Sequence, residues 1–536
     1  MARFGGPGPS GSRGATWWPN PRGNPLGWSL TARAQVRILC AKSDRLCAMR
    51  PQTEEVGLPE TATVGEEPAP ERAPRSLRTY LDHIRDRPEE LITIGRLANP
   101  LGFEVTAVLE HLDRQGRFPA VLFENVLDIH GEKSRFPILT NLWATRERCA
   151  EMLGLPRSQS GRELGVRFSE LVGREVAPVT VARGDAPVQA NVLEGGRADM
   201  HRLPGVRHFE MDLGPVFTMA HVMHAPGADF YNITFVKTFP ETGRQGGLTI
   251  HTPHLSRMLR EWERRGERIP VVNVLGHHPA FWLGSLALTP YGTNEYATVG
   301  AFLREPLRLV PSVTWGSEFL VPADAEIVIE GELIPNQRTI VDPFGEITRL
   351  YQAQELAPVM EVKAITYRDG AIMQDVFSGH REHFLLGLIP REGSVYNHLQ
   401  RTLGNVTAVH LPSSGNGRSV CYISIKKTSE SQPKQTAMQA LAHAPTFQAV
   451  VVVDDDIDVF NEEDVLWAVN TYVDPARDID LIKNLGRWSE RQMGNNRILI
   501  DATRPTHTAF PTRLRVPSEA MAAVKLEEWL DPIGGR

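Results

Sequence analysis

The chain has few cysteines and no long apolar run. Only four of its 536 residues are cysteines, Cys40, Cys47, Cys149 and Cys421, and none of them form a pair with the spacing of a zinc finger or a dithiol redox motif. No apolar stretch reaches the roughly 18 residues that a membrane-spanning helix needs. These two absences predict a protein of a reducing cytoplasm, with no membrane partner.

Net charge is also low for this length. Lys and Arg number 58 against 64 Asp and Glu, which gives a net charge of −6. So small a balance argues against a general affinity for nucleic acid or for an anionic membrane surface. The length itself exceeds one ordinary core, so two or three domains are expected.

The first 75 residues differ from the rest. Positions 1–50 hold eight Lys and Arg against one acid, and positions 51–75 hold six Glu and five Pro. The first stretch has the Arg-rich, acid-poor composition of a transit peptide. The preferred interpretation is a disordered extension over 1–75, with Met49 as an alternative start and a flexible linker before Ser76.

Three regions with different sequence patterns follow along the chain. Residues 76–175 predict a mixed α/β domain: Ser76 caps a helix with Leu77, Tyr80, Leu81 and Ile84 on one face, and a second helix near 104–112 precedes a strand at 120–123. Residues 176–368 are rich in β-branched runs, at 216–223, 233–237, 271–275, 326–329 and 359–367. They are interrupted by one helix that places Leu255, Met258, Leu259 and Trp262 on one face. The pattern of this second region favours a barrel with insertions.

In the last region, 369–536, predicted strands and helices alternate. Strands are expected at 420–426 and 449–453, each followed by a helix, at 433–442 and at 462–472 with Val465, Leu466 and Val469. Alternation of this kind predicts an α/β domain with some parallel pairing.

A widely spaced set of polar residues lies between 231 and 346, mostly at the ends of apolar runs. Asn232, His254 and Glu295 offer an amide, an imidazole and a carboxylate, which suit Mg²⁺ or Mn²⁺ with open positions for phosphate oxygens. Lys237 and Glu346 add a cation and a candidate proton donor. Glu346 follows Pro343 and Gly345, which predict a tight turn, and burial there would raise its pKa toward neutrality.

Each of these residues also has an ordinary interpretation. Asn232 could be a turn residue, His254 could cap or pack a helix, and Glu295 could be a favourable charge at a helix start. Glu346 could be a solvated loop residue, and Lys237 could point to solvent. Asp454, Asp455 and Asp456 could bind a cation, but acids after a strand more often cap the turn. His251 lies three residues from His254, yet Pro253 between them argues against a shared helical face.

At these residues the chain resembles the UbiD family of decarboxylases, which use prenylated FMN. The resemblance runs from about residue 76 to the C-terminus. It rests on the segments YNITFVKTF, the Ile-His-Thr-Pro-His run, NEYATVGAFL, EFLVPADAEIVIEGEL, DPFGEIT, YISIKK and VVVVDDDIDVFNEEDVLWA. It implies an N-terminal α/β domain, a central flavin-reductase-like split β-barrel and a C-terminal α/β domain used in oligomerisation.

The resemblance also implies roles for individual residues. Asn232, His254 and Glu295 match the positions that hold Mn²⁺ or Mg²⁺ against the cofactor phosphate. The residues expected to line the prenylated flavin are Thr234, Phe235, Val236, Lys237, Pro253 and His254. Ser285 falls near the family's K⁺ site, and Lys426 falls where a basic residue approaches the phosphate.

The chain departs from the family pattern at two catalytic positions. The family's acid–Arg–acid trio is represented by Lys237 in place of arginine, by Val341 in place of the first acid, and by a retained Glu346. Lysine is a point charge on a flexible stem, whereas arginine is a rigid fork. Without an acid at Val341, Lys237 is expected to be free for a substrate carboxylate, or to be held by Asp342.

The resulting hypothesis is reversible, non-oxidative decarboxylation of an aromatic or α,β-unsaturated carboxylic acid. Lys237 would steer the carboxylate and Glu346 would protonate the carbon that loses CO₂. A flavin prenyltransferase would supply the cofactor, and the chain would form a homodimer or homohexamer. Two alternatives stay open: an accessory homologue that binds the cofactor without decarboxylating, favoured by Val341, and a split-barrel flavoprotein that uses ordinary FMN for redox chemistry.

Overall fold

The computed structural model describes residues 73–341, 343–485 and 495–529. The predicted extension over 1–75 therefore lies almost wholly outside the described residues, as do Cys40, Cys47 and Asp342. Residues from Glu71 onward form one unit by their contacts. No helix within the described ranges is long and apolar enough to cross a membrane.

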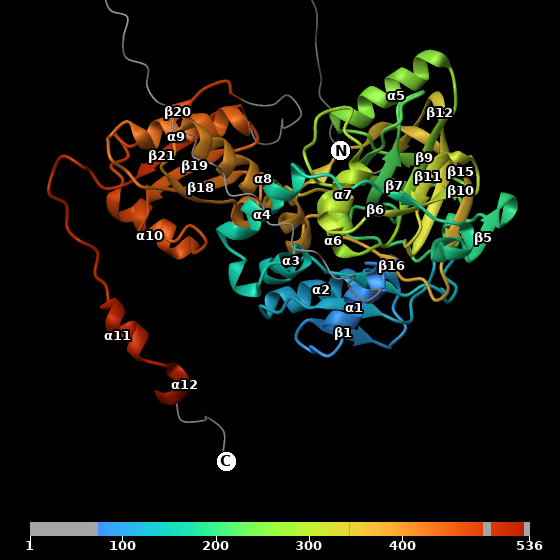
Figure 1. Cartoon of the computed structure of the whole chain (residues 1–536), viewed down its shortest axis with the longest axis horizontal. Helices are drawn as coiled ribbons and strands as arrows, with labels where there is room; N and C mark the ends of the chain where they lie inside the picture. Colours follow the sequence, from blue (N-terminus) through green and yellow to red (C-terminus); the bar gives the residue numbers. More distant parts are fainter. Residues whose placement is uncertain (1–72, 342, 486–494, 530–536) are drawn as a thin grey trace, which may run out of the picture. The chain divides into compact units, whose positions relative to one another are not determined.

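The N-terminal part contains a small sheet covered by helices (Figure 1). Strand order is β1-β2-β3-β16, with β16 contributed by a segment that follows the barrel in sequence. Ser76 caps α1 as predicted, in a capping box with Thr79. The elements are α1 Leu77–Ile84, β1 Leu91–Ile94, α2 Glu104–Arg114, β2 Ala120–Phe123, β3 Ile138–Thr140, α3 Arg146–Met152, α4 Arg162–Val172 and β16 Met373–Gln374.

The central part is a closed six-stranded barrel. Its order is β12-β9-β6-β7-β8-β15, and β12 pairs again with β15 to close the ring, while β5 extends from β15. The barrel strands are β6 Phe217–Met223, β7 Asn232–Pro240, β8 Gln245–Leu248, β9 Ile269–Val274, β12 Ile327–Val341 and β15 Glu355–Tyr367, with β5 at Asn191–Glu194. The predicted barrel is confirmed, although β12 runs well beyond the expected 326–329.

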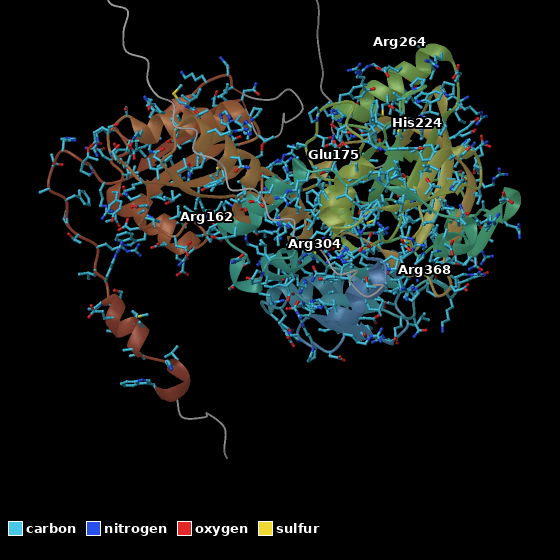
Figure 2. All side chains as sticks on the ribbon, in the orientation of Figure 1. Arg162, Glu175, His224, Arg264, Arg304 and Arg368 are labelled. Atoms are coloured by element: carbon cyan, nitrogen blue, oxygen red, sulfur yellow. The ribbon has the colours of Figure 1, made fainter. Side chains whose placement is uncertain are left out.

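Three helices and two small sheets accompany the barrel. Helix α5 buries the four residues predicted for its apolar face, and Trp262 Nε1 donates to the carbonyl of His224 at 2.8 Å; Figure 2 labels His224 on the barrel and Arg264 on α5. The additional elements are α5 Pro253–Arg265, α6 Pro279–Gly284, α7 Glu295–Leu303, β4 Val179–Thr180, β10 Arg308–Ser312, β11 Gly316–Pro322, β13 Phe344–Gly345 and β14 Tyr351–Gln352.

The C-terminal part is a five-stranded α/β sheet of order β17-β18-β19-β21-β20. The β18–β19 and β19–β21 pairs are parallel, as the alternation predicted. The helix expected at 462–472 is present as α10; its buried residues are Val465, Ala468 and Tyr472, whereas Leu466 is half exposed. The elements are α8 Arg381–Thr402, β17 Val406–His410, β18 Val420–Ile425, α9 Gln432–His443, β19 Ala449–Asp454, α10 Glu462–Tyr472, β20 Ile479–Ile482, β21 Arg497–Ala502, α11 Ser518–Ala523 and α12 Leu526–Trp529.

Candidate active site

Strand β7 carries two of the predicted site residues. It begins at Asn232 and reaches Lys237 five residues later, a span of about 16 Å at roughly 3.3 Å per residue. Side chains alternate across a strand, so Asn232, Thr234 and Val236 share one face while Phe235 and Lys237 lie on the other. The predicted flavin-lining residues of this strand are thus divided between its two faces.

Lys237 and Glu346 form an ion pair. The Nζ of Lys237 lies 2.6 Å from Oε1 of Glu346 and 4.6 Å from the ring centroid of Phe344. Only 9% of the Lys237 side chain is exposed, and 28% of that of Glu346. The expectation that Lys237 would be free for want of an acid at Val341 was wrong, because the retained Glu346 itself binds the ammonium group.

The charge of Glu346 also differs from expectation. Burial favours the neutral acid, but the charges of Lys237 and His383 and the hydrogen bonds from Lys237 and the Ile347 N–H outweigh it and lower the pKa to about 2. The predicted rise toward neutrality was therefore wrong for the ligand-free protein. Glu346 is a carboxylate here, and it can act as an acid only after its pairing with Lys237 changes.

Two histidines that sequence reasoning did not assign to the site lie within electrostatic reach of this pair. Burial lowers the pKa of His383 to about 4, and its Nδ1 accepts the Gly379 N–H at 3.0 Å. The pKa of His251 is raised by its hydrogen bond to Glu355, 2.8 Å away, and by the charge of Glu346. No motif signalled His383, whereas His251 was set aside because of Pro253.

Asn232, His254 and Glu295 come together from β7, α5 and α7. Asn232 Nδ2 donates to Glu295 Oε1 at 2.7 Å and lies 3.4 Å from His254 Nδ1, which is 3.9 Å from the same carboxylate oxygen. Glu295 also accepts from Thr289 Oγ1 at 2.9 Å and from the Ile233 N–H at 2.5 Å. The three predicted metal ligands are thus neighbours despite their distance in sequence.

This donor set fits a hard divalent cation. The Oδ1 of Asn232 is buried and has no hydrogen-bond partner among the described residues, so the set contains one unsatisfied acceptor. Burial raises the pKa of Glu295 to about 7, and a nearby cation would offset the cost of burying this carboxylate. Burial also lowers the pKa of His254, which keeps its ring neutral, the form that binds a metal.

The remaining predicted residues are more dispersed. Pro253 occupies the first turn of α5, directly before His254. Ser285 caps α6 and donates from Oγ to the carbonyl of Trp282 at 2.8 Å. Lys426 follows β18 with an exposed side chain, and no hydrogen bond or ion pair within the described ranges joins it to Asn232 or His254. The alternative in which Asp342 holds Lys237 concerns a residue outside the described part of the chain.

Val341 belongs to a small apolar cluster next to the ion pair. It is 1% exposed and packs with four other buried residues, Val216, Phe239, Phe344 and Ala357. The ring of Phe344 in this cluster also lies under the Lys237 ammonium group. The position of the family's first acid is therefore part of a packed apolar cluster.

A cavity of about 140 Å³ opens beside Glu346. Phe209, Tyr351 and Phe377 give it aromatic walls, and Arg349 and His380 add polar groups. An apolar cavity of roughly 150 Å³ is large enough for one benzene ring. The cavity beside the Glu346 carboxylate is therefore close to the volume of a single aromatic ring.

The chain is similar to proteins of one family along most of its length. Three family-level matches cover residues 84–168, 179–381 and 384–502, described as the N-terminal, Rift-related and C-terminal domains of 3-octaprenyl-4-hydroxybenzoate carboxy-lyase. A gallate decarboxylase of Lactiplantibacillus plantarum is 27% identical over 440 residues, which cover 77% of this chain and 88% of that protein.

Solved structures give the same result. The UbiD-class enzyme HmfF of Pelotomaculum thermopropionicum, in complex with FMN, is 30% identical with a TM-score of 0.78, covering 85% of this chain and all of that one. An evolved dimeric form of HmfF, in complex with prFMN, has a TM-score of 0.76 at the same identity and coverage. The open form of the vanillic acid decarboxylase ShVdcCD of Sedimentibacter hydroxybenzoicus, with truncated ShVdcD, is 27% identical with a TM-score of 0.74 over 85% of this chain and 99% of that one. With its three domains matched in order, the chain belongs to the UbiD family of carboxy-lyases.

Proposed function

We propose that the chain catalyses reversible, non-oxidative decarboxylation of an aromatic carboxylic acid with prenylated FMN as cofactor. The observation that carries this proposal is the Lys237–Glu346 ion pair at 2.6 Å beside a ring-sized aromatic cavity. Among the similar proteins, HmfF binds prFMN, and the gallate and vanillic acid decarboxylases are named for aromatic acids. An α,β-unsaturated acid is the less favoured substrate, because the cavity walls match a ring.

Asn232, His254 and Glu295 would hold Mn²⁺ or Mg²⁺ against the cofactor phosphate. We assign the lining of the flavin ring system to Pro253 and to backbone and side-chain atoms of Thr234, Phe235, Val236 and Lys237. Bound prenylated FMN would supply an electron sink for the bond to CO₂. We assign Lys426 to the phosphate and Ser285 to a K⁺ site on the family pattern alone, and the domain boundaries 76–175, 176–368 and 369–536 stay predictions of the same kind.

The ion pair suggests how Glu346 takes up and delivers a proton during the reaction. A substrate carboxylate that binds Lys237 draws the ammonium group away from Glu346. The pKa of Glu346 then rises, because its main stabilising charge is shared and a second anion is close. Glu346 can take a proton in that state and deliver it to the carbon that has lost CO₂. We propose His251, whose pKa is raised and whose charge interacts with that of Glu346, as the source of this proton.

An accessory homologue remains the second candidate. The observation in its favour is Val341, which replaces an acid by a buried residue of an apolar cluster. Such a protein would bind the cofactor without turning over an aromatic acid. A redox flavoprotein that uses ordinary FMN would instead oxidise NADH or NADPH.

The test is co-expression with a flavin prenyltransferase, followed by native mass spectrometry and absorbance. The loaded protein is then incubated with single-ring aromatic acids in D₂O, and H/D exchange and CO₂ release are measured. Exchange into any acid supports the decarboxylase. Bound prenylated FMN with no exchange across hydroxylated, methoxylated and heteroaromatic acids supports the accessory homologue, and bound FMN with NAD(P)H oxidation contradicts both.

A further inference from the structure

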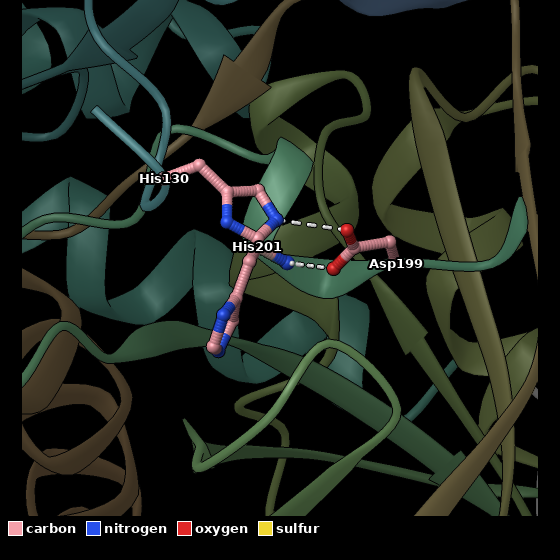
Figure 3. Close-up of side chains that lie close together, drawn as sticks. All are labelled: His130, Asp199 and His201. Atoms are coloured by element: carbon pink, nitrogen blue, oxygen red, sulfur yellow. Dashed lines mark hydrogen bonds and ion pairs between the residues drawn. The ribbon is translucent and has the colours of Figure 1, made fainter. Parts of the chain in front are cut away.

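Three potential metal ligands, none of them part of the candidate active site, lie close together. His130 lies in the loop between β2 and β3, and Asp199 and His201 lie at the short 3₁₀ helix η6, Met200–Arg202, that precedes the barrel. A nitrogen or oxygen atom of each lies within 4.8 Å of one from each of the other two. Figure 3 shows the side chains of His130 and Asp199 pointing toward one another, with the ring of His201 turned aside.

The two backbone segments are held together independently of these side chains. The N–H of His130 donates to the carbonyl of His201 at 3.3 Å, and that of Ile129 to Leu203 at 3.2 Å. The N–H of Met200 donates to the carbonyl of Gly243 at 2.7 Å. The backbone therefore places the three ligands before any ion arrives, which lowers the entropy cost of binding one.

The side-chain geometry is close to what a metal requires. His130 Nε2 and Asp199 Oδ2 are 2.9 Å apart, joined by a hydrogen bond, whereas two ligands about 2.1 Å from a tetrahedral ion are roughly 3.4 Å apart, so this pair would open slightly on binding. The ligand atoms of all three residues lie within 4.8 Å of one another, so a modest swing of the His201 ring completes the set. His201 Nε2 lies 3.4 Å from the carbonyl of Pro240, an outer contact that would leave Nδ1 as the ligand atom.

The surrounding charges favour a cation. Asp128 and Glu132 lie beside Arg202, which also approaches Asp199 at 4.0 Å, so three carboxylates face one guanidinium group. Hydrogen bonds from the His130 ring and from the His201 N–H orient the Asp199 carboxylate.

We propose that His130, Asp199 and His201 form a second metal site, which binds a first-row transition ion such as Zn²⁺ or Ni²⁺. Two imidazoles and one carboxylate favour these ions over Mg²⁺ and Mn²⁺, which the Asn232 set suits better. The ion would fasten the β2–β3 loop to the segment that enters the barrel. Its effect is on stability, and turnover does not depend on it.

The experiment uses the full-length protein, stripped with a chelator and kept in excess Mg²⁺ so that oxygen-rich sites are filled. Zn²⁺ binding is measured by calorimetry, and the Co²⁺ form is examined by visible absorption. We expect His130→Ala and His201→Ala each to weaken Zn²⁺ binding by at least about tenfold, as losing even an outer-sphere partner does. His111→Ala, which removes an exposed histidine of α2, is the matched control and should bind Zn²⁺ as the unaltered protein does.

Thermal melting provides the second readout. Zn²⁺ should raise the Tm of the unaltered protein and of His111→Ala, but not that of the two triad variants. His130→Gln, which can still donate to Asp199 but is a poor ligand, replaces His130→Ala if alanine disturbs the loop. Equal Zn²⁺ affinity in the unaltered protein and both triad variants, or no Zn²⁺ uptake at all, overturns the proposal.

Discussion

At the scale of single residues, Glu346 has two roles in the site. It neutralises Lys237 in the ligand-free protein, and it is the only acid of the family trio that the chain retains. The sequence made Glu346 identifiable as a candidate acid because of the turn around it. It could not show that Lys237 would become its partner, since the two are 109 residues apart.

Replacing Glu346 by Gln removes the proposed proton donor while keeping the side chain's size. We expect turnover of the loaded enzyme to fall by about 10²–10⁴-fold, the usual contribution of a general acid. Substrate-dependent H/D exchange measures this. Glu519→Gln, an exposed acid of α11, is the control, and near-full exchange by Glu346→Gln would remove Glu346 from the mechanism.

The same residue gives a pH-dependent contribution to stability. Its pKa is lowered from 4.5 to about 2, so the folded state binds fewer protons than the unfolded state between these values. The stabilisation is complete above about pH 4.5 and is lost as the pH falls toward 2. Urea unfolding at pH 6 and pH 3 should show a smaller loss of stability in Glu346→Gln than in the unaltered protein, and an equal loss would contradict the ion pair in solution.

Site geometry was only partly predictable at this scale. Asn232, His254 and Glu295 were chosen as a set, and the structure brings them together. The contribution of His383 was not predictable, because it depends on where α8 passes. Nothing near His383 in sequence distinguishes it from the buried histidines at other positions, such as His221 and His277.

At the scale of elements, most strands with clear β-branched runs were predicted within a few residues, whereas β12 extends to Val341, far beyond the expected end at 329. Helix α8 was missed, although it is 22 residues long. Pro390 lies inside it, and proline removes a hydrogen bond and crowds the preceding turn. Twelve of its residues are buried, so packing against neighbouring elements outweighs that local cost.

Close packing between strands leads to a prediction about Val341, which stands where the family has its first acid. A Cβ atom at Gly247 of β8 would lie 2.3 Å from Cγ1 of Val341 on β12, a strand that β15 separates from β8 in the barrel order. Gly247→Ala should therefore destabilise the protein by about 1–3 kcal/mol. The double variant with Val341→Ala should recover part of this loss in urea unfolding, as expected for residues in contact.

Gly184→Ala is the matched control, since a Cβ there meets nothing within 4 Å. Its effect should stay within about 0.5 kcal/mol. A double variant no more stable than the sum of its single changes would show that the two strands adjust independently.

The proposed cofactor metal ties β7, α5 and α7 together, since each supplies one ligand. Removing divalent ions with a chelator should lower the Tm, and Mn²⁺ should restore it by preferential binding to the folded state. His254→Ala should respond less to Mn²⁺ than the unaltered protein. Matching Mn²⁺ responses in the two proteins would argue against His254 as a ligand.

At the scale of the whole molecule, the three-part order and the barrel were predictable from the family resemblance and from the change of sequence pattern along the chain. The extra strand β16 was not. It adds two residues from beyond the barrel to the first sheet, a pairing too short for any periodicity to mark.

The C-terminal segment leads to a prediction about assembly. Several large apolar side chains are exposed there, namely Leu514, Val516, Met521, Leu526 and Trp529. Exposed apolar residues in such a group mark a contact surface, and a second copy of the chain is the expected partner. Ending the chain after Phe510 should lower the number of chains per particle measured by native mass spectrometry, and an unchanged number would place the subunit contact elsewhere.

The pairing of β16 with β3 has a consequence for synthesis. The first three strands of the sheet are synthesised more than two hundred residues before Met373 and Gln374. At about 5–20 residues per second, that interval is on the order of 10–50 s. Throughout it the edge of β3 has no partner, so the nascent chain presents an open hydrogen-bonding edge that chaperones would be expected to cover.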